Sequence, residues 1–149
     1  MMRMVKAIFL LPIALLLVPA VFAASPQSGT GSFTIAVSDQ QTRSAGGNTI
    51  ITQHEVLTIT GVMSGTCTGS EIDIVHAHST LNAHGTCDFT GTVQGKDVSG
   101  TFQFNAVNNG KSFTGHFGTT HNSGIHVRGT FQPTGPTSGT YTASFHFTP

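Results

Sequence analysis

The sequence predicts an all-β fold, a single eight-stranded antiparallel barrel, and three observations support that prediction. Apolar and polar residues alternate with a period of two over most of the chain, as in strands that bury one face. After the first 23 residues, no stretch has apolar residues at the helical spacing i, i+3, i+4 and i+7. Turn residues separate the alternating runs at short intervals.

The turn signals divide the chain into strands in order. Gly46-Gly47 separates the first two runs, and the QGK at 94–96 makes a later tight turn. The NNGK at 108–111 contains the Asn-Gly pair that favours a type I′ turn, and the PTGPTSG at 133–139 precedes the last run. We therefore expect strands over residues 31–38, 49–61, 65–77, 84–93, 97–107, 112–120, 125–132 and 139–147.

One face of these strands is apolar, and Thr, Ser, His and Gln predominate on the other. The apolar face is expected to include Phe33, Ile35, Val37, Phe102, Phe104, Phe113, Phe117, Ile125, Val127, Phe131, Tyr141, Phe145 and Phe147. Such a pattern fits an up-and-down barrel or a sandwich. A closed barrel has no edges, which suits a chain with only 8% charged residues. An outer-membrane barrel also alternates, but it needs aromatic girdles, and this chain has no Trp and one Tyr.

The N-terminus has the pattern of a signal peptide. A basic start precedes an apolar run from Ala7 to Val18, and Val21 and Ala23 suit signal peptidase. The run is too short for a comfortable membrane span. We expect a signal peptide over 1–23 with cleavage after Ala23, and a secreted or periplasmic protein.

The rest of the chain is one domain by size, with a flexible leader over 24–30 and the barrel over 31–149. Two of the six basic residues lie in the signal peptide, so six acidic side chains outnumber the basic ones that remain. Nucleic-acid binding needs a basic footprint, which is missing. The sequence indicates no oligomeric state.

The two cysteines, Cys67 and Cys87, favour a disulfide in an exported protein. Strand alternation raises a conflict, however. Cys87 shares the inward face of its strand, whereas Cys67 would point outward if Ile72 and Ile74 face inward. A bulge at Thr68-Gly69 would remove this conflict, but a simple hairpin would still leave the cysteines several residues out of alignment. The bridged and free states both stay open.

The second strand carries a candidate acid or base. Gln53 and Glu55 share parity with Leu57 and would then point inward, where burial raises the pKa of a carboxyl into the range useful for catalysis. The opposite orientation places Ile50 and Val56 inside and leaves Glu55 on the surface. Both orientations stay open.

The HAH at 76–78 places two imidazoles at a strand end, near a barrel mouth. His76 and His78 would form half of a zinc or copper site. The nearest third ligand, His84, has the opposite parity on the next strand. We therefore expect no metal site and no cofactor.

Three segments, GTCDFTGTVQGKDVSGTFQF at 85–104, LTITGVMSGT at 57–66 and GTYTASFHF at 139–147, resemble domain-of-unknown-function family 3224, small bacterial proteins. The resemblance implies an allene oxide cyclase-like eight-stranded barrel. The family has no established activity. No catalytic residue therefore carries over. This chain also has Cys87-Asp88 where a Glu-Arg pair is typical and Ala106 where a histidine is common, so it departs from the family at any polar site built on those positions.

Three functions follow as hypotheses. The first is a module that binds a small apolar ligand inside the barrel. The second is an isomerase or cyclase in which Glu55 acts on a reactive small molecule, by analogy with allene oxide cyclase-like barrels. The third is a structural barrel with a filled core. The expected ligand-binding residues are Gln53, His76, His78, Phe102, Phe104, Phe117, Tyr141 and Phe145.

Overall fold

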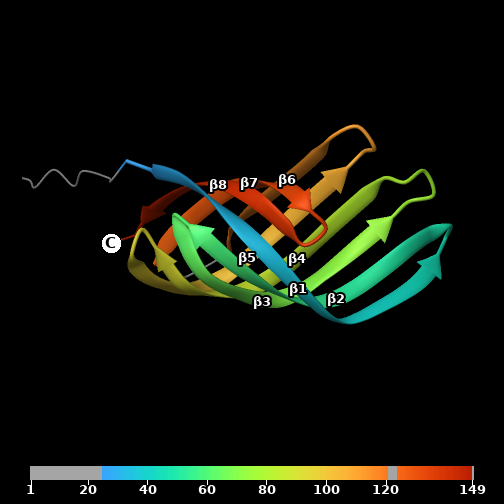
Figure 1. Ribbon diagram of the computed structural model, residues 1–149, viewed down its shortest axis with the longest axis horizontal. Coiled ribbons are helices and arrows are strands. Elements are labelled where there is room, and N and C mark those ends of the chain that lie inside the picture. Colours follow the sequence, from blue (N-terminus) through green and yellow to red (C-terminus); the bar gives the residue numbers. More distant parts are fainter. Residues whose placement is uncertain (1–24, 121–123, 149) are drawn as a thin grey trace, which may run out of the picture.

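The computed structural model describes residues 25–120 and 124–148, and within these ranges every regular element is a strand. The strands are β1 (Gln27–Ala45), β2 (Asn48–Gly61), β3 (Met63–Val75), β4 (Leu81–Val93), β5 (Lys96–Asn108), β6 (Phe113–Thr119), β7 (Ile125–Gly135) and β8 (Ser138–Phe147). Each strand pairs antiparallel with the next, and β1 pairs with β8, so the sheet closes into a barrel (Figure 1). The predicted all-β barrel is therefore confirmed. The predicted signal peptide lies outside the described residues.

The first strand is longer than expected at both ends. Gln27–Thr30, in the expected leader, pair with β8. At the other end, the pairing of β1 with β2 shifts between Ser38 and Gln41, and Asp39 adopts a φ of 49°. This bulge interrupts the alternation, and the polar residues after it resemble a loop in the sequence.

Two of the tight turns are as predicted, and the third differs. Gly46 and Gly47, with φ of 60° and 82°, join β1 to β2, and Gln94 and Gly95, with φ of 48° and 76°, join β4 to β5. The NNGK turn is a longer loop, because the Asn109 side-chain oxygen accepts hydrogen bonds from the backbone N–H groups of Lys111 (3.0 Å) and Ser112 (2.9 Å). Side-chain capping of this kind replaces the expected type I′ turn.

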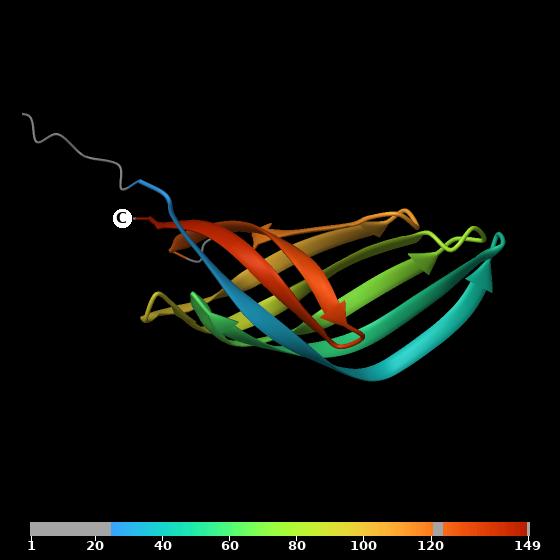
Figure 2. The same ribbon diagram turned by 45° about the horizontal axis from the view of Figure 1, so that its top comes forward.

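The two ends of the barrel differ. The closed end carries the β2–β3 and β4–β5 turns, and the open end carries the β1–β2, β3–β4 and β5–β6 turns. The β7–β8 hairpin stops short of the open end (Figure 2). Its last contact with β1 is the hydrogen bond from the Ile35 N–H to the Thr137 carbonyl, 2.8 Å. Beyond it, the Ala36–Ala45 part of β1 pairs with β2 alone among the described strands.

The hydrophobic core lies toward the closed end. Its buried members are Met63, Cys67, Cys87, Phe89, Val93, Val98, Phe102, Ile125, Val127, Tyr141, Ala143 and Phe145. Most of the predicted apolar face belongs to this core or packs against it. Ile35 and Phe104 line the cavity described below, and Phe113 packs on Phe131. Val37 is 45% exposed, because it lies beyond the point where β8 leaves β1.

Aromatic rings on the inner face lie over glycines of neighbouring strands. Phe89 pairs directly with Gly100. Four further phenylalanines pair with glycines that lie under their rings: Phe33 with Gly139, Phe104 with Gly85, Phe117 with Gly129, and Phe131 with Gly115. A Cβ built on any of these glycines would lie 2.3–2.7 Å from its partner's ring. Packing therefore explains why glycine and phenylalanine are both frequent in this chain. Each ring lies against the backbone of a glycine, where the side chain of a larger residue would displace the ring.

Candidate functional site

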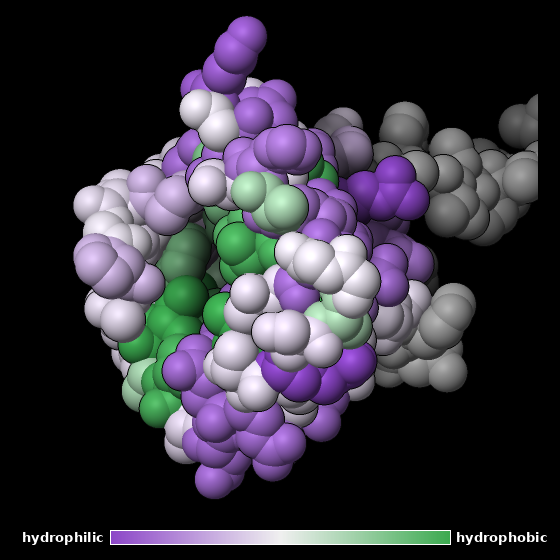
Figure 3. Space-filling model, turned by 90° about the vertical axis from the view of Figure 1, so that its right-hand side faces the viewer, coloured by the Kyte–Doolittle hydropathy of each residue, from purple (hydrophilic) through white to green (hydrophobic). Residues whose placement is uncertain are grey.

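A cavity of about 100 Å³ lies inside the barrel between the two ends. Its lining is mostly aromatic and aliphatic: Phe33, Ile35, Glu55, Leu57, Ile59, Met63, Cys67, Glu71, Cys87, Phe89, Phe102, Phe104, Phe117, Phe131 and Tyr141. Figure 3, which views the barrel from the open end, shows a hollow with hydrophobic side chains at its base. The interior is thus incompletely filled and is reached from the open end.

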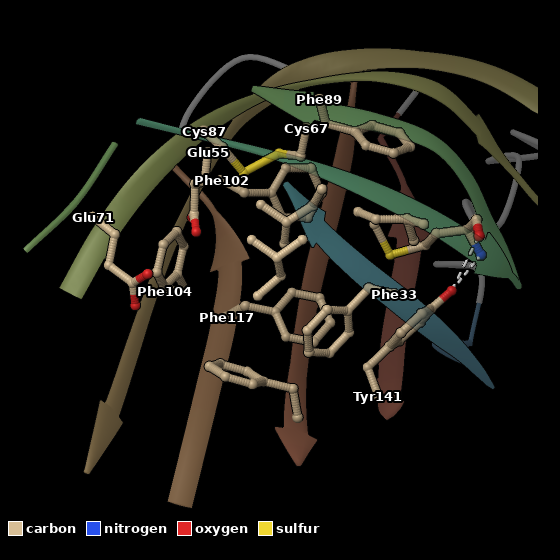
Figure 4. Close-up of a pocket in the computed structure, with 15 residues that line it drawn as sticks. Phe33, Glu55, Cys67, Glu71, Cys87, Phe89, Phe102, Phe104, Phe117 and Tyr141 are labelled. Atoms are coloured by element: carbon tan, nitrogen blue, oxygen red, sulfur yellow. Dashed lines mark hydrogen bonds between the residues drawn. A yellow bond between two sulfur atoms is a disulfide. The ribbon is translucent and has the colours of Figure 1, made fainter. Parts of the chain in front are cut away.

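Tyr141 forms one wall of this cavity and is anchored by its hydroxyl. The oxygen accepts the Met63 N–H at 2.9 Å (Figure 4). The single hydroxyl proton is shared between the carbonyls of Thr60 and Met63, each 3.1 Å away. Burial raises the pKa of Tyr141, so the hydroxyl stays protonated. With its hydroxyl hydrogen-bonded to the backbone, Tyr141 contributes its ring to the cavity wall and fixes the β2–β3 turn.

The cysteines lie on the cavity wall and form a disulfide, with Cα atoms 5.4 Å apart. They are offset by two positions, because Cys67 pairs with Phe89 and Cys87 pairs with Gly69. A Cβ on Gly69 would lie 2.7 Å from the Cys87 Cβ, so the glycine leaves room for the diagonal bridge.

The expected face of β3 was wrong. Its pairing with β4 is continuous, so no bulge is needed, and Cys67 and Glu71 both line the cavity. Alternation then directs Ile72 and Ile74 outward. On the outer face, Ile74 pairs with Ile50 across β2, and all three isoleucines are half-buried. Mutual cross-strand contact therefore covers these apolar side chains without placing them in the core.

Glu55 and Gln53 point inward. Glu55 is 2% exposed and Gln53 is 8% exposed, whereas Val56, on the opposite face of β2, is 40% exposed. The alternative orientation, with Val56 inside and Glu55 on the surface, is therefore wrong. The Glu55 Oε1 atom has no hydrogen-bond partner. Desolvation raises the pKa of Glu55. A hydrogen bond with Glu71 lowers that pKa in part, and the negative charge of Asp73 raises it further.

Two further carboxyls, absent from the predicted site residues, join Glu55. Glu71 pairs with Gln53 across the strands and accepts a hydrogen bond from its Nε2 at 2.9 Å. Burial first, and the charge of Glu55 next, raise the pKa of Glu71 to about 7. Burial and the charge of Glu71 raise the pKa of Asp73 to about 6. We refer to Glu55, Glu71 and Asp73 as the carboxyl cluster.

A signal for this cluster existed in the sequence. A hairpin centred on Val62 pairs Gln53 with Glu71, so an inward Gln53 implies an inward Glu71. The prediction placed Ile72 in the core, and strand alternation then directs the neighbouring Glu71 outward.

The structure brings together some of the predicted binding residues and separates others. Glu55, Phe102, Phe104, Phe117 and Tyr141 line the cavity, and Gln53 contacts Glu71 beside it. Phe145 is 1% exposed in the closed-end core, where it packs against Phe147.

The two histidines of the HAH segment do not line the cavity. Because β3 ends at Val75, strand alternation no longer governs their directions. His76 lies 3.2 Å from the Asn48 Oδ1 and 3.1 Å from the Asn82 Nδ2, and His78 is exposed in the β3–β4 turn. Across residues 25–120 and 124–148, no group of three His, Cys, Asp or Glu side chains is arranged to hold a metal ion.

These features define an antiparallel barrel with a small apolar cavity and a carboxyl cluster at its open end. The same fold occurs in the crystal structure of a protein of unknown function from the DUF3224 family of Shewanella oneidensis MR-1. The two structures have a TM-score of 0.72 and 16% sequence identity, over 83% of this chain and 98% of that one. At this identity the match shows a shared fold, in agreement with the resemblance to domain-of-unknown-function family 3224.

No family model matches the sequence, and no curated protein is significantly similar to it. The part of the chain that the structure describes contains no helix long and apolar enough to cross a membrane.

Proposed function

We propose that this protein is an exported barrel that binds a small apolar molecule in its interior. The observation that carries the proposal is the cavity of about 100 Å³ with its lining of phenylalanine and aliphatic side chains. An apolar cavity of about 150 Å³ takes up benzene. This cavity is smaller, at about 100 Å³, but it is reached from the open end, so it suits at most a single ring or a short branched chain. The disulfide is consistent with an oxidising compartment, as the predicted export requires.

Toluene is a suitable probe of this proposal. We expect it to raise the melting temperature of the mature protein and to shift the NMR signals of residues around the cavity, such as Leu57 and Phe117, because it binds the folded state alone. Absence of both effects at saturating toluene would contradict the proposal.

A matched pair of variants tests the location. Leu57→Phe places extra volume in the cavity wall and should abolish toluene binding. Val56→Phe, at the neighbouring outward position, should leave it intact. Equal binding by the two variants would place the toluene elsewhere.

A second candidate is proton transfer to a bound substrate, as in the isomerase or cyclase hypothesis. The supporting observation is that Glu55, with a raised pKa and a free oxygen, forms part of the cavity wall. Cyclopentanone in heavy water provides a test. A base in contact with it would remove an α-proton and return a deuteron. We expect incorporation above the buffer rate for the wild type and none for Glu55→Gln; equal rates for the two would exclude the role.

A further inference from the structure

The carboxyl cluster has acceptor atoms without donors. Glu55 is 98% buried, and neither its Oε1 nor the Asp73 Oδ1 has a hydrogen-bond partner among the described residues. Besides the hydrogen bonds that the three carboxyls share with one another, the cluster receives the Gln53 amide, whose own oxygen accepts from the Gln40 Nε2 at 3.0 Å. Buried acceptors without donors are costly, and a bound molecule that supplies N–H groups would remove that cost.

The cluster also carries negative charge that no basic side chain offsets. Within the described chain, no lysine or arginine acts on Glu55, Glu71 or Asp73; the one positive influence is His84, which acts on Asp73. The negative charge of this site therefore favours a cationic ligand.

The cluster adjoins the apolar cavity, so its complement has two parts. Figure 4 shows the Glu55 and Glu71 carboxyl groups beside the ring of Phe104, with Tyr141 on the opposite side of the cavity. A ligand that fills both regions has a charged donor group at the open end and an apolar group among the rings. An ammonium group provides three N–H donors and can also contact the Phe104 ring as a cation.

We infer that the barrel binds a small primary amine, with its ammonium group between Glu55 and Glu71 and its apolar group in the phenylalanine-lined cavity. This inference rests on the proposed function, because it requires the cavity to accept an apolar group. It adds the chemical class of the ligand and the residues that select it.

Binding of a cation has a consequence for protons. An ammonium group favours the ionised carboxylates and lowers their pKa, so protons leave the site when the amine binds. The affinity should therefore rise as the pH rises through the range of about 6 to 7 in which Asp73 and Glu71 titrate. A ligand that accepts a hydrogen bond from a protonated carboxyl would show the opposite trend.

Benzylamine and toluene form a matched pair of probes, since they share the ring and differ by the amine. Calorimetric or NMR titration of the mature protein with benzylamine should give at least about tenfold tighter binding than toluene at pH 7.5, and weaker binding at pH 5.5. Glu71→Gln and Glu55→Gln should each weaken benzylamine about tenfold or more and leave toluene binding unchanged. Unchanged toluene binding also shows that the variants fold.

Asp88→Asn is the control, because this carboxyl lies exposed on the outer face and accepts a hydrogen bond from Thr101. It should leave both affinities unchanged. If toluene binds but benzylamine is no tighter, or if the Asp88 variant weakens it equally, the amine inference is wrong and the proposed function stands. If neither probe binds, both are wrong. Displacement of benzylamine by equimolar Ca²⁺ or Zn²⁺ would overturn the inference in favour of a metal site.

Discussion

The two ends of this barrel belong to one continuous sheet and differ in what their inner faces bury. At the closed end, a core of aromatic and aliphatic side chains is sealed by the Tyr141 hydroxyl, which bonds with the backbone of the β2–β3 turn. At the open end, the inner face of β2 and β3 carries three carboxyls whose pKa values are raised. The closed end thus supplies stability, whereas the open end keeps a polar site that destabilises the fold when it ionises.

The disulfide lies between the two ends, and its loss should have the largest effect. The bridge closes a loop of 20 residues, so Cys67→Ala with Cys87→Ala should lower the free energy of unfolding by about 3 kcal/mol. Urea denaturation of the double variant and the oxidised wild type measures this. A change below about 1 kcal/mol would mean that the closed-end core alone holds the barrel together.

Removal of the Tyr141 hydroxyl tests the closed end. Tyr141→Phe leaves the ring in place but deprives the buried Met63 N–H of its acceptor, which should cost about 2 kcal/mol. The same denaturation experiment applies. Hydrogen exchange at the Met63 amide should also accelerate, and an unchanged exchange rate would show that the hydroxyl does not fasten the turn.

The open end should show its character in the pH dependence of stability. The pKa of Glu71 is about 7 in the folded protein against 4.5 ordinarily, so the folded state binds protons more tightly than the unfolded state. Its contribution is stabilising below pH 4.5 and is lost as the pH rises through 7. The unfolding free energy of the wild type, measured relative to that of the Glu71→Gln variant, should therefore fall by about 1–2 kcal/mol between pH 5 and pH 8. A difference that stays flat or rises with pH would contradict the raised pKa.

Glu55→Leu should increase the stability of the fold, by less than the Tyr141 variant decreases it. It replaces a buried carboxyl lacking one hydrogen-bond partner with hydrocarbon, and should raise the unfolding free energy by about 1 kcal/mol at pH 7.5. Benzylamine binding should be lost. A destabilised variant would mean that Glu55 supports the fold, and Glu55→Gln serves as the control for volume.

Much of the fold could be predicted from alternation and turn residues, since β4 to β8 and the first half of β1 have one apolar face and one polar face. Alternation failed where it was interrupted or where both faces were partly apolar. The bulge after Ser38 hid the second half of β1, and the outward pair of Ile50 and Ile74 suggested a core face that is an outer one. Hydrophobicity identifies the buried face only where the other face is polar.

The site was less predictable than the fold, because the surroundings of its residues depend on where individual strands end. Glu55 could be identified by its parity with Leu57, but the role of Glu71 required the hairpin register as well as the parity of Cys67. The placement of the HAH segment depended on where β3 ends, which its alternation did not reveal. No local pattern indicates that the β7–β8 hairpin stops short and leaves the carboxyl cluster near solvent.

The outer edge of Ala36–Ala45 in β1, which pairs with no strand of the described residues, has a consequence for self-association. A free strand edge is a template on which another chain can add its own strand and begin an aggregate. Here the irregularity between Ser38 and Gln41, with Asp39 in a left-handed conformation, divides that template into two short pieces. An incoming strand would lose its hydrogen-bond register after a few residues. The bulge thereby protects against intermolecular sheet growth while leaving the mouth of the barrel uncovered.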